Sequence, residues 1–72
     1  MNESEALLLQ RLATRDVEVE RLLSRHQAFE ERLAQLDRHR WLSAEERREM
    51  TELKRRKLAG RDRMQQILRA SA

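Results

Sequence analysis

Apolar residues recur along the first forty positions of the chain at alternating steps of four and three. The positions on this stripe are Leu8, Leu12, Arg15, Val19, Leu22, His26, Phe29, Leu33, Leu36 and Arg40. Most of them are apolar, and the step pattern is the heptad repeat of a coiled coil. The pattern predicts one continuous helix over about residues 4–39.

A second stripe runs through the C-terminal half of the chain. It consists of Met50, Leu53, Lys57, Gly60, Met64 and Ile67, flanked by Leu58 and Leu68. Ser43 and Glu46 stand just before it with the spacing of a capping box, in which each side chain bonds the other residue's backbone amide. The sequence therefore predicts a second helix over about residues 44–69. A close approach of Gly60 to Leu22 and Leu23 is the favoured reason for a glycine there, and a break at Gly60 is the alternative.

A turn near Trp41 pairs the two stripes in antiparallel register, so that Val19 faces Met64 and Leu33 faces Met50. Because apolar positions meet at nearly every layer, the sequence predicts an all-α helix–turn–helix hairpin. Its predicted core consists of Leu22, His26, Phe29, Leu33, Leu36, Met50, Leu53, Met64 and Ile67. We expect Trp41 to cover the end of this core as a lid. An exposed Trp41 would instead be an anchor for a protein partner.

The two predicted helices differ in length, so the first extends past the end of the second. Leucines that lie beyond the second helix would be exposed to water, which favours association with another chain. We therefore expect a homodimer with a four-helix, coiled-coil-like core. The residues predicted for this interface are Leu7, Leu8, Leu9, Leu12 and Val19.

Composition agrees with a small helical protein. The chain has 72 residues, enough for one domain over residues 1–72, and it has no proline and one glycine. It has no cysteine, so neither a disulfide nor a thiolate zinc site can supply stability, and a reducing compartment such as the cytoplasm is expected. No segment approaches the roughly 20 apolar residues of a membrane span. The sequence predicts a soluble protein without a membrane partner.

Few residues offer catalytic chemistry. The chain has no cysteine, no tyrosine and no glycine-rich phosphate loop, and its serines lack a positioned base. We expect no concave pocket, no enzymatic activity, no cofactor or metal, and no small-molecule substrate. His26 lies on the apolar stripe with Lys57 opposite and Glu30 one turn on, where a polar residue would fix the register. A pH-responsive group and a metal ligand are the alternatives.

Basic residues concentrate in the second half: residues 43–72 carry nine Lys or Arg against five Asp or Glu. The leading prediction is a self-associating structural or protein-interaction module, with another protein as a further partner, whose basic residues form a solvated surface. The alternative is a small nucleic-acid-associated protein that uses the basic face of the second helix. The residues for that contact would be Lys54, Arg55, Arg56, Arg61 and Arg63.

Part of the chain also matches a family pattern. The residues that carry it are His26, Phe29, Leu33 and Leu36, then the block from Leu53 to Leu58, then Asp62, Met64 and Leu68. Over about residues 22–68 the chain resembles the YdcH-like family of small bacterial α-hairpin proteins of unknown function. Arg61, Gly60 and Arg63 depart from the usual lysine, apolar and acidic residues of that pattern. The resemblance implies the hairpin fold and no catalytic residue.

Overall fold

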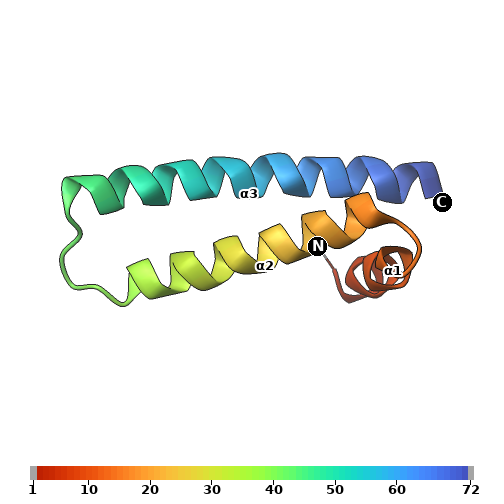
Figure 1. Cartoon of the computed structure of the whole chain (residues 1–72), viewed down its shortest axis with the longest axis horizontal. Coiled ribbons are helices and arrows are strands. Elements are labelled where there is room, and N and C mark those ends of the chain that lie inside the picture. Colours follow the sequence, from red (N-terminus) through yellow and green to blue (C-terminus); the bar gives the residue numbers. More distant parts are fainter. Residues whose placement is uncertain (1, 72) are drawn as a thin grey trace.

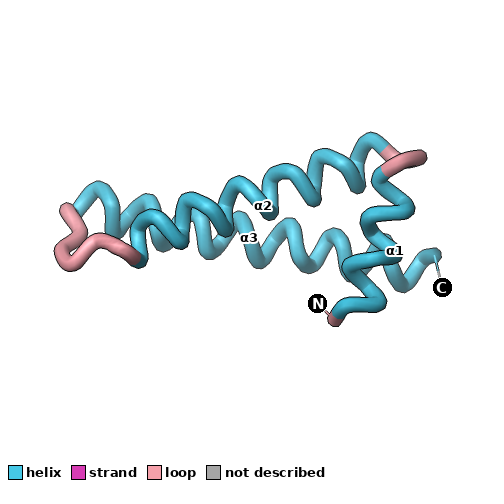
Figure 2. Tube along the Cα trace, turned by 90° about the horizontal axis from the view of Figure 1, so that it is seen from below, coloured by secondary structure: helices cyan, strands magenta, loops and turns pink. Residues whose placement is uncertain are grey.

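Three α-helices make up the protein in a computed structural model that describes residues 2–71. Their bounds are α1 Glu3–Ala13, α2 Val17–Asp37 and α3 Ala44–Ser71. No strand occurs in the described residues, which confirms the all-helical prediction. Helices α2 and α3 lie side by side and run in opposite directions (Figure 1). Helix α1 crosses the end of this pair where α2 begins and α3 ends (Figure 2).

The prediction of one continuous helix over about residues 4–39 is wrong, because the chain turns between α1 and α2. At the turn, the Thr14 hydroxyl donates to the Arg11 carbonyl oxygen at 2.7 Å. An Asp16 side-chain oxygen accepts from the backbone N–H of Glu18 at 2.9 Å and so caps α2. Thr and Asp side chains bond nearby backbone in this way in competition with helical hydrogen bonds. These local bonds end α1 although the heptad spacing continues through the turn.

The turn folds α1 back onto the other two helices and builds a core within the single chain. Leu9 of α1 is buried in one cluster with Val19 of α2 and with Met64 and Leu68 of α3. Around the cluster pack partly buried Leu12, Ala13, Leu22, Leu23 and Ile67. The expectation that Leu9, Leu12 and Val19 lie in an oligomer interface is therefore corrected: folding of α1 covers these side chains in the monomer.

The nine residues predicted for the core are all buried or half-buried. Leu33, Leu36 and Met64 are buried, and the other six are half-buried. The pairing of Val19 with Met64 is realised, since both belong to the same cluster. Leu9 and Val19 are also fully buried in the core, although the sequence predicts them for the oligomer interface.

The start of α3 has the capping box that the sequence predicts. The Ser43 backbone N–H donates to Glu46 Oε1 at 3.0 Å, and the Glu46 backbone N–H donates to Ser43 Oγ at the same distance. The hydrogen bond from Ser43 holds the pKa of Glu46 below its ordinary range. His39 Nδ1 lies 2.9 Å from Glu46 Oε2, which ties the beginning of the loop, just after α2, to the first turn of α3.

The expected lid at the loop is absent from the described chain. The Trp41 side chain is 83% exposed, so the prediction that it covers the hairpin core is wrong. The neighbouring Leu42 is half-buried instead. Leu33 and Leu36, near the end of α2, are already buried. One half-buried apolar residue in the loop is therefore enough to cover this end of the core.

Gly60 lies inside an unbroken α3, so the chain does not break there. A Cβ built on Gly60 would meet nothing within 4 Å, which excludes the predicted close approach to Leu22 and Leu23. The backbone of Gly60 has no positive φ angle either. Neither contact nor conformation therefore requires a glycine at this position.

We predict that Gly60→Ala stabilises the protein. Alanine is favoured over glycine in a helix interior by about 1 kcal/mol, and the space beside Gly60 accepts its methyl group. The melting temperature followed by circular dichroism should rise by about 4–8 °C. A fall in melting temperature would show that the space beside Gly60 is smaller than the structure indicates.

Candidate functional site

Two arginine–glutamate ion pairs link α2 to α3 along one side of the helix pair. Arg32 Nε donates to Glu49 Oε2 at 2.7 Å, and Arg32 Nη2 donates to Glu49 Oε1 at 2.9 Å. Arg63 binds Glu18 in the same two-pronged way, with both hydrogen bonds at 2.8 Å. Bidentate pairs of this kind fix geometry as well as contributing energy. They hold α2 and α3 in one register at two separate levels.

Two arginines occupy the level midway between these ion pairs. On α2, three residues follow one another at intervals of seven: Glu18, Arg25 and Arg32. On α3, the positions that match them in the same order are Arg63, Arg56 and Glu49. Since seven residues are close to two helical turns, Arg25 and Arg56 hold equivalent places across the pair. An acidic residue at either place would complete an arginine–glutamate pair at this level as well. Both positions instead carry an arginine. A third interhelical ion pair, Lys57–Glu30, joins neighbouring positions.

The two central arginines differ in their own partners. Arg25 takes part in none of the ion pairs found in the described chain, whereas Arg56 Nε donates to Glu52 Oε1, on the same helix, at 3.0 Å. Neither arginine is joined to the opposite helix by a hydrogen bond within residues 2–71. Among the described residues, Arg25 and Arg56 thus have no carboxylate of the opposite helix as a partner, while the nearby Glu30 of α2 pairs with Lys57 of α3.

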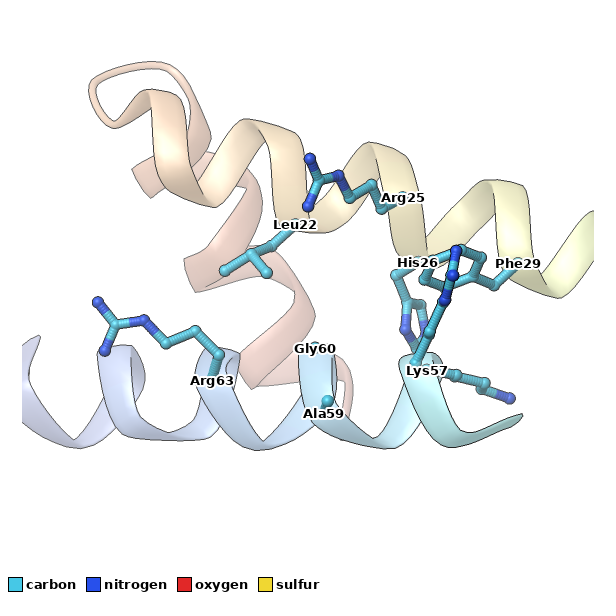
Figure 3. A pocket seen from close by; sticks show the side chains of 9 residues that line it. Leu22, Arg25, His26, Phe29, Lys57, Ala59, Gly60 and Arg63 are labelled. Carbon is cyan, nitrogen blue, oxygen red and sulfur yellow. The ribbon is translucent and has the colours of Figure 1, made fainter. Parts of the chain in front are cut away.

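A groove of about 670 Å³ lies between α2 and α3 at this level. It is lined by Leu22, Arg25, His26, Phe29, Arg56, Lys57, Ala59, Gly60 and Arg63. Four of these residues are apolar or glycine, five are basic, and none is acidic. In Figure 3, Leu22 points from α2 toward α3 between the side chains of Arg25 and Arg63. The expectation of a chain without a concave pocket is therefore wrong.

Small residues on α3 explain why the groove exists. Ala59 and Gly60 lie where larger side chains would fill the space across from Leu22 and Phe29. Because no side chain fills it, Phe29 is half-buried at the groove wall. The glycine and alanine together are the sequence signal that could have revealed the groove.

His26 lies at the groove wall with the neighbours that the sequence predicts. Lys57 Nζ of α3 is 2.8 Å from Glu30 Oε1, and His26 Nε2 is 3.3 Å from the same oxygen. The hydrogen bond from Lys57 lowers the pKa of Glu30 below its ordinary range. His26 Nδ1 is buried and has no hydrogen-bond partner among the described residues. No group of three metal-ligating side chains is found in residues 2–71.

The basic residues predicted for nucleic-acid contact fall on different sides of α3. Arg56 and Arg63 line the groove, and Arg63 is paired with Glu18. Residues two positions apart in a helix point about 160° away from one another. Lys54 and Arg61 therefore point away from the groove side. The fifth residue, Arg55, is 3.9 Å from Glu52 and exposed.

Comparison of the chain with protein-family models, with curated proteins and with solved structures finds no match. The likeness to the YdcH-like family thus stays a prediction from the residues that carry it. In the described part of the chain, no helix has both the length and the apolar character needed to cross a bilayer.

We predict that the two arginine–glutamate ion pairs between α2 and α3 make stability depend on acid pH. Hydrogen bonds from Arg32 and Arg63 hold the pKa values of Glu49 and Glu18 below their ordinary value of 4.5. A lowered carboxyl pKa contributes stability above the unfolded value and loses it as pH falls through the folded value. The melting temperature of the wild type should exceed that of Glu18→Gln with Glu49→Gln at neutral pH. The difference should begin to shrink as the pH falls below 4.5 and should vanish once the pH lies below the lowered pKa values of the folded protein.

Glu31 supplies the control, because this exposed glutamate takes part in none of the ion pairs of the described chain. Glu31→Gln should differ from the wild type by the same small amount at neutral and at acid pH. An advantage of the wild type over the double variant that does not shrink as the pH is lowered from neutral through the acid range would contradict the assignment.

Proposed function

We propose that the protein is a non-enzymatic helical interaction module that works as a homodimer. The observation that supports it is the large surface of the single chain. The accessible surface is 5849 Å² for a mass of 8.7 kDa. The relation between surface and mass in monomeric proteins gives roughly 4,700 Å² for that mass, so the excess is roughly 1,100 Å². A standard protein interface buries about 800 Å² of each partner.

Exposed apolar side chains suggest where the second copy would bind. Leu7 is 51% exposed, Leu8 is 37% exposed and Val17 is 59% exposed. All three belong to α1 or to the first residue of α2, which together form one end of the molecule. Large apolar side chains that gather at one end of a monomer are typical of an interaction surface. Leu7 and Leu8 are also the two predicted interface residues that α1 leaves exposed after folding back.

The chemistry of the groove supports a role in binding rather than in catalysis. None of its nine lining residues is a carboxylate, a hydroxyl or a thiol. A nucleophile needs an adjacent base within hydrogen-bond reach, and general acid–base work needs a positioned titrating pair. His26 is the one imidazole among the lining side chains, and no lining nucleophile accompanies it.

We predict that Leu7→Glu with Leu8→Glu weakens self-association. The two charges would have to be buried between the copies without partners, which opposes assembly strongly. Sedimentation equilibrium of the full chain at high micromolar concentration should show a dimer for the wild type and a monomer for the variant. Point variants are preferred to deletion of α1, because Leu9 of α1 belongs to the core of the single chain.

Ala28→Glu with Ala70→Glu is the matched control. Both alanines are exposed, and the change in net charge equals that of the leucine variant. The control should dimerise like the wild type. A wild type that stays monomeric at these concentrations would refute the proposed function, and a control that dissociates equally would show a general effect of charge.

A further inference from the structure

The groove carries binding capacity that the proposed dimer does not use. Its lining includes Arg25 of α2 and Arg56 of α3, which hold equivalent positions in the register, together with apolar Leu22 and Phe29. We propose that this groove binds a small amphipathic organic anion, with its carboxylate or phosphate head between Arg25 and Arg56 and its apolar chain over Leu22 and Phe29. This inference does not rest on self-association, because the proposed dimer surface contains no groove residue.

Charge complementarity selects an anion for the head. A guanidinium group stays protonated at any physiological pH, and the groove lining holds three of these groups and no carboxylate. The levels on either side are each completed by a glutamate, at Glu18 and Glu49. An anionic oxygen pair placed at the central level would complete the row in the same way. The planar fork of arginine binds carboxylate and phosphate oxygens with two hydrogen bonds.

The side chain of Arg25 is free to contact the anionic head group. It is exposed and unpaired in the described chain, so binding would break no existing ion pair at this residue. Arg56 holds Glu52 through a single Nε contact, which leaves its terminal nitrogens available as donors. Arg63 is committed to Glu18 by two hydrogen bonds and would close the end of the groove.

Apolar surface selects a ligand with an apolar chain. Leu22, Phe29, Ala59 and Gly60 line the groove, and the position beside Gly60 is empty. Ligand pockets for small molecules commonly enclose about 300–1,000 Å³, and this groove has about 670 Å³. A protein partner would need about 20–30 residues on each side of its interface, more than the nine residues here. The dimensions therefore favour a small molecule over a partner helix.

An unsatisfied nitrogen at the groove wall agrees with an incomplete site. His26 Nδ1 is the buried side-chain nitrogen that lacks a hydrogen-bond partner in residues 2–71. Buried polar atoms are nearly always satisfied, and the exceptions often mark a place for a ligand or a water molecule. The charged groups that face His26 are Glu30 on its own helix and Lys57 on α3.

A second copy is a poorer occupant of this groove. In a face-to-face dimer with its two-fold axis at the central level, Arg25 and Arg56 of one copy would meet the same residues of the other. Like charges brought together across an interface suppress association. The arginine level thus disfavours this surface as a symmetric dimer interface and leaves it open to an anion.

Decanoate is the probe for the test, with decyl phosphate as the second head group. Resonances of the full-length protein, labelled with ¹⁵N, are followed during titration with each probe. Decanoate and decyl phosphate should shift the amides of the groove residues. 1-Decanol, used below its solubility limit, lacks the anionic head, and acetate lacks the long apolar chain. Each should therefore bind at least about ten-fold more weakly than decanoate. Equal binding of decanol and decanoate would refute the role of the arginines.

Three variants of the full chain test the residues. Arg25→Gln with Arg56→Gln should weaken decanoate binding about ten-fold or more, the usual effect of removing charge-assisted hydrogen bonds. Gly60→Leu should fill the groove and abolish binding while the circular dichroism spectrum is retained, because the space beside Gly60 is open. Arg48→Gln with Arg69→Gln removes two exposed arginines outside the groove and should bind like the wild type.

The outcomes separate this inference from the proposed dimer. Absence of groove shifts with both anions, or unchanged affinity in the Arg25 and Arg56 variant, would overturn the anion site whatever the oligomeric state. A change in sedimentation of that variant without any anion binding would also overturn it, because the groove would then face a second copy. Binding of decanoate by a monomeric wild type would support the site and refute the dimer.

Discussion

The burial of Leu9 beneath the crossing of α1 is the contact on which the rest of the molecule depends. Two antiparallel helices each present a stripe of apolar residues. When only these two stripes pack together, part of their apolar surface stays exposed to water. Helix α1 covers the end of the pair where α2 begins and α3 ends by placing Leu9 against Val19, Met64 and Leu68. The Glu18–Arg63 ion pair involves the chain neighbours of Val19 and Met64. Apolar burial and charge thus fix the same register at this end of the molecule.

Much of this architecture could be predicted because its causes are local or periodic. The heptad stripe predicts the inward side of α2, and the Ser43–Glu46 capping box predicts the start of α3. The break at residues 14–16 was missed because Leu12 and Val19 keep their spacing across it. Its causes are single hydrogen bonds of Thr14 and Asp16, which a periodic pattern does not register. Because the spacing hides this break, the sequence predicts that the leucines of α1 contact a second chain.

The groove could be predicted only in part, because it depends on two helices at once. Ala59 and Gly60 were visible as small residues, but a small residue on a helix indicates close approach as readily as open space. The helix separation, which decides between these outcomes, is set by the larger side chains on either side. The opposition of Arg25 and Arg56 likewise follows from the register. That register is visible as a row of pairs only once Glu18–Arg63 and Arg32–Glu49 are located.

The exposure of Trp41 has a spectroscopic consequence. It is the single tryptophan of a chain without tyrosine, and it lies in the loop between α2 and α3 with 83% of its surface in solvent. Its indole is surrounded by water in the native state and in the unfolded state alike. Intrinsic fluorescence should therefore be nearly silent to unfolding of the three helices. The same emission would instead shift to shorter wavelength when another molecule covers the loop, so the residue is a natural reporter of contacts at that end.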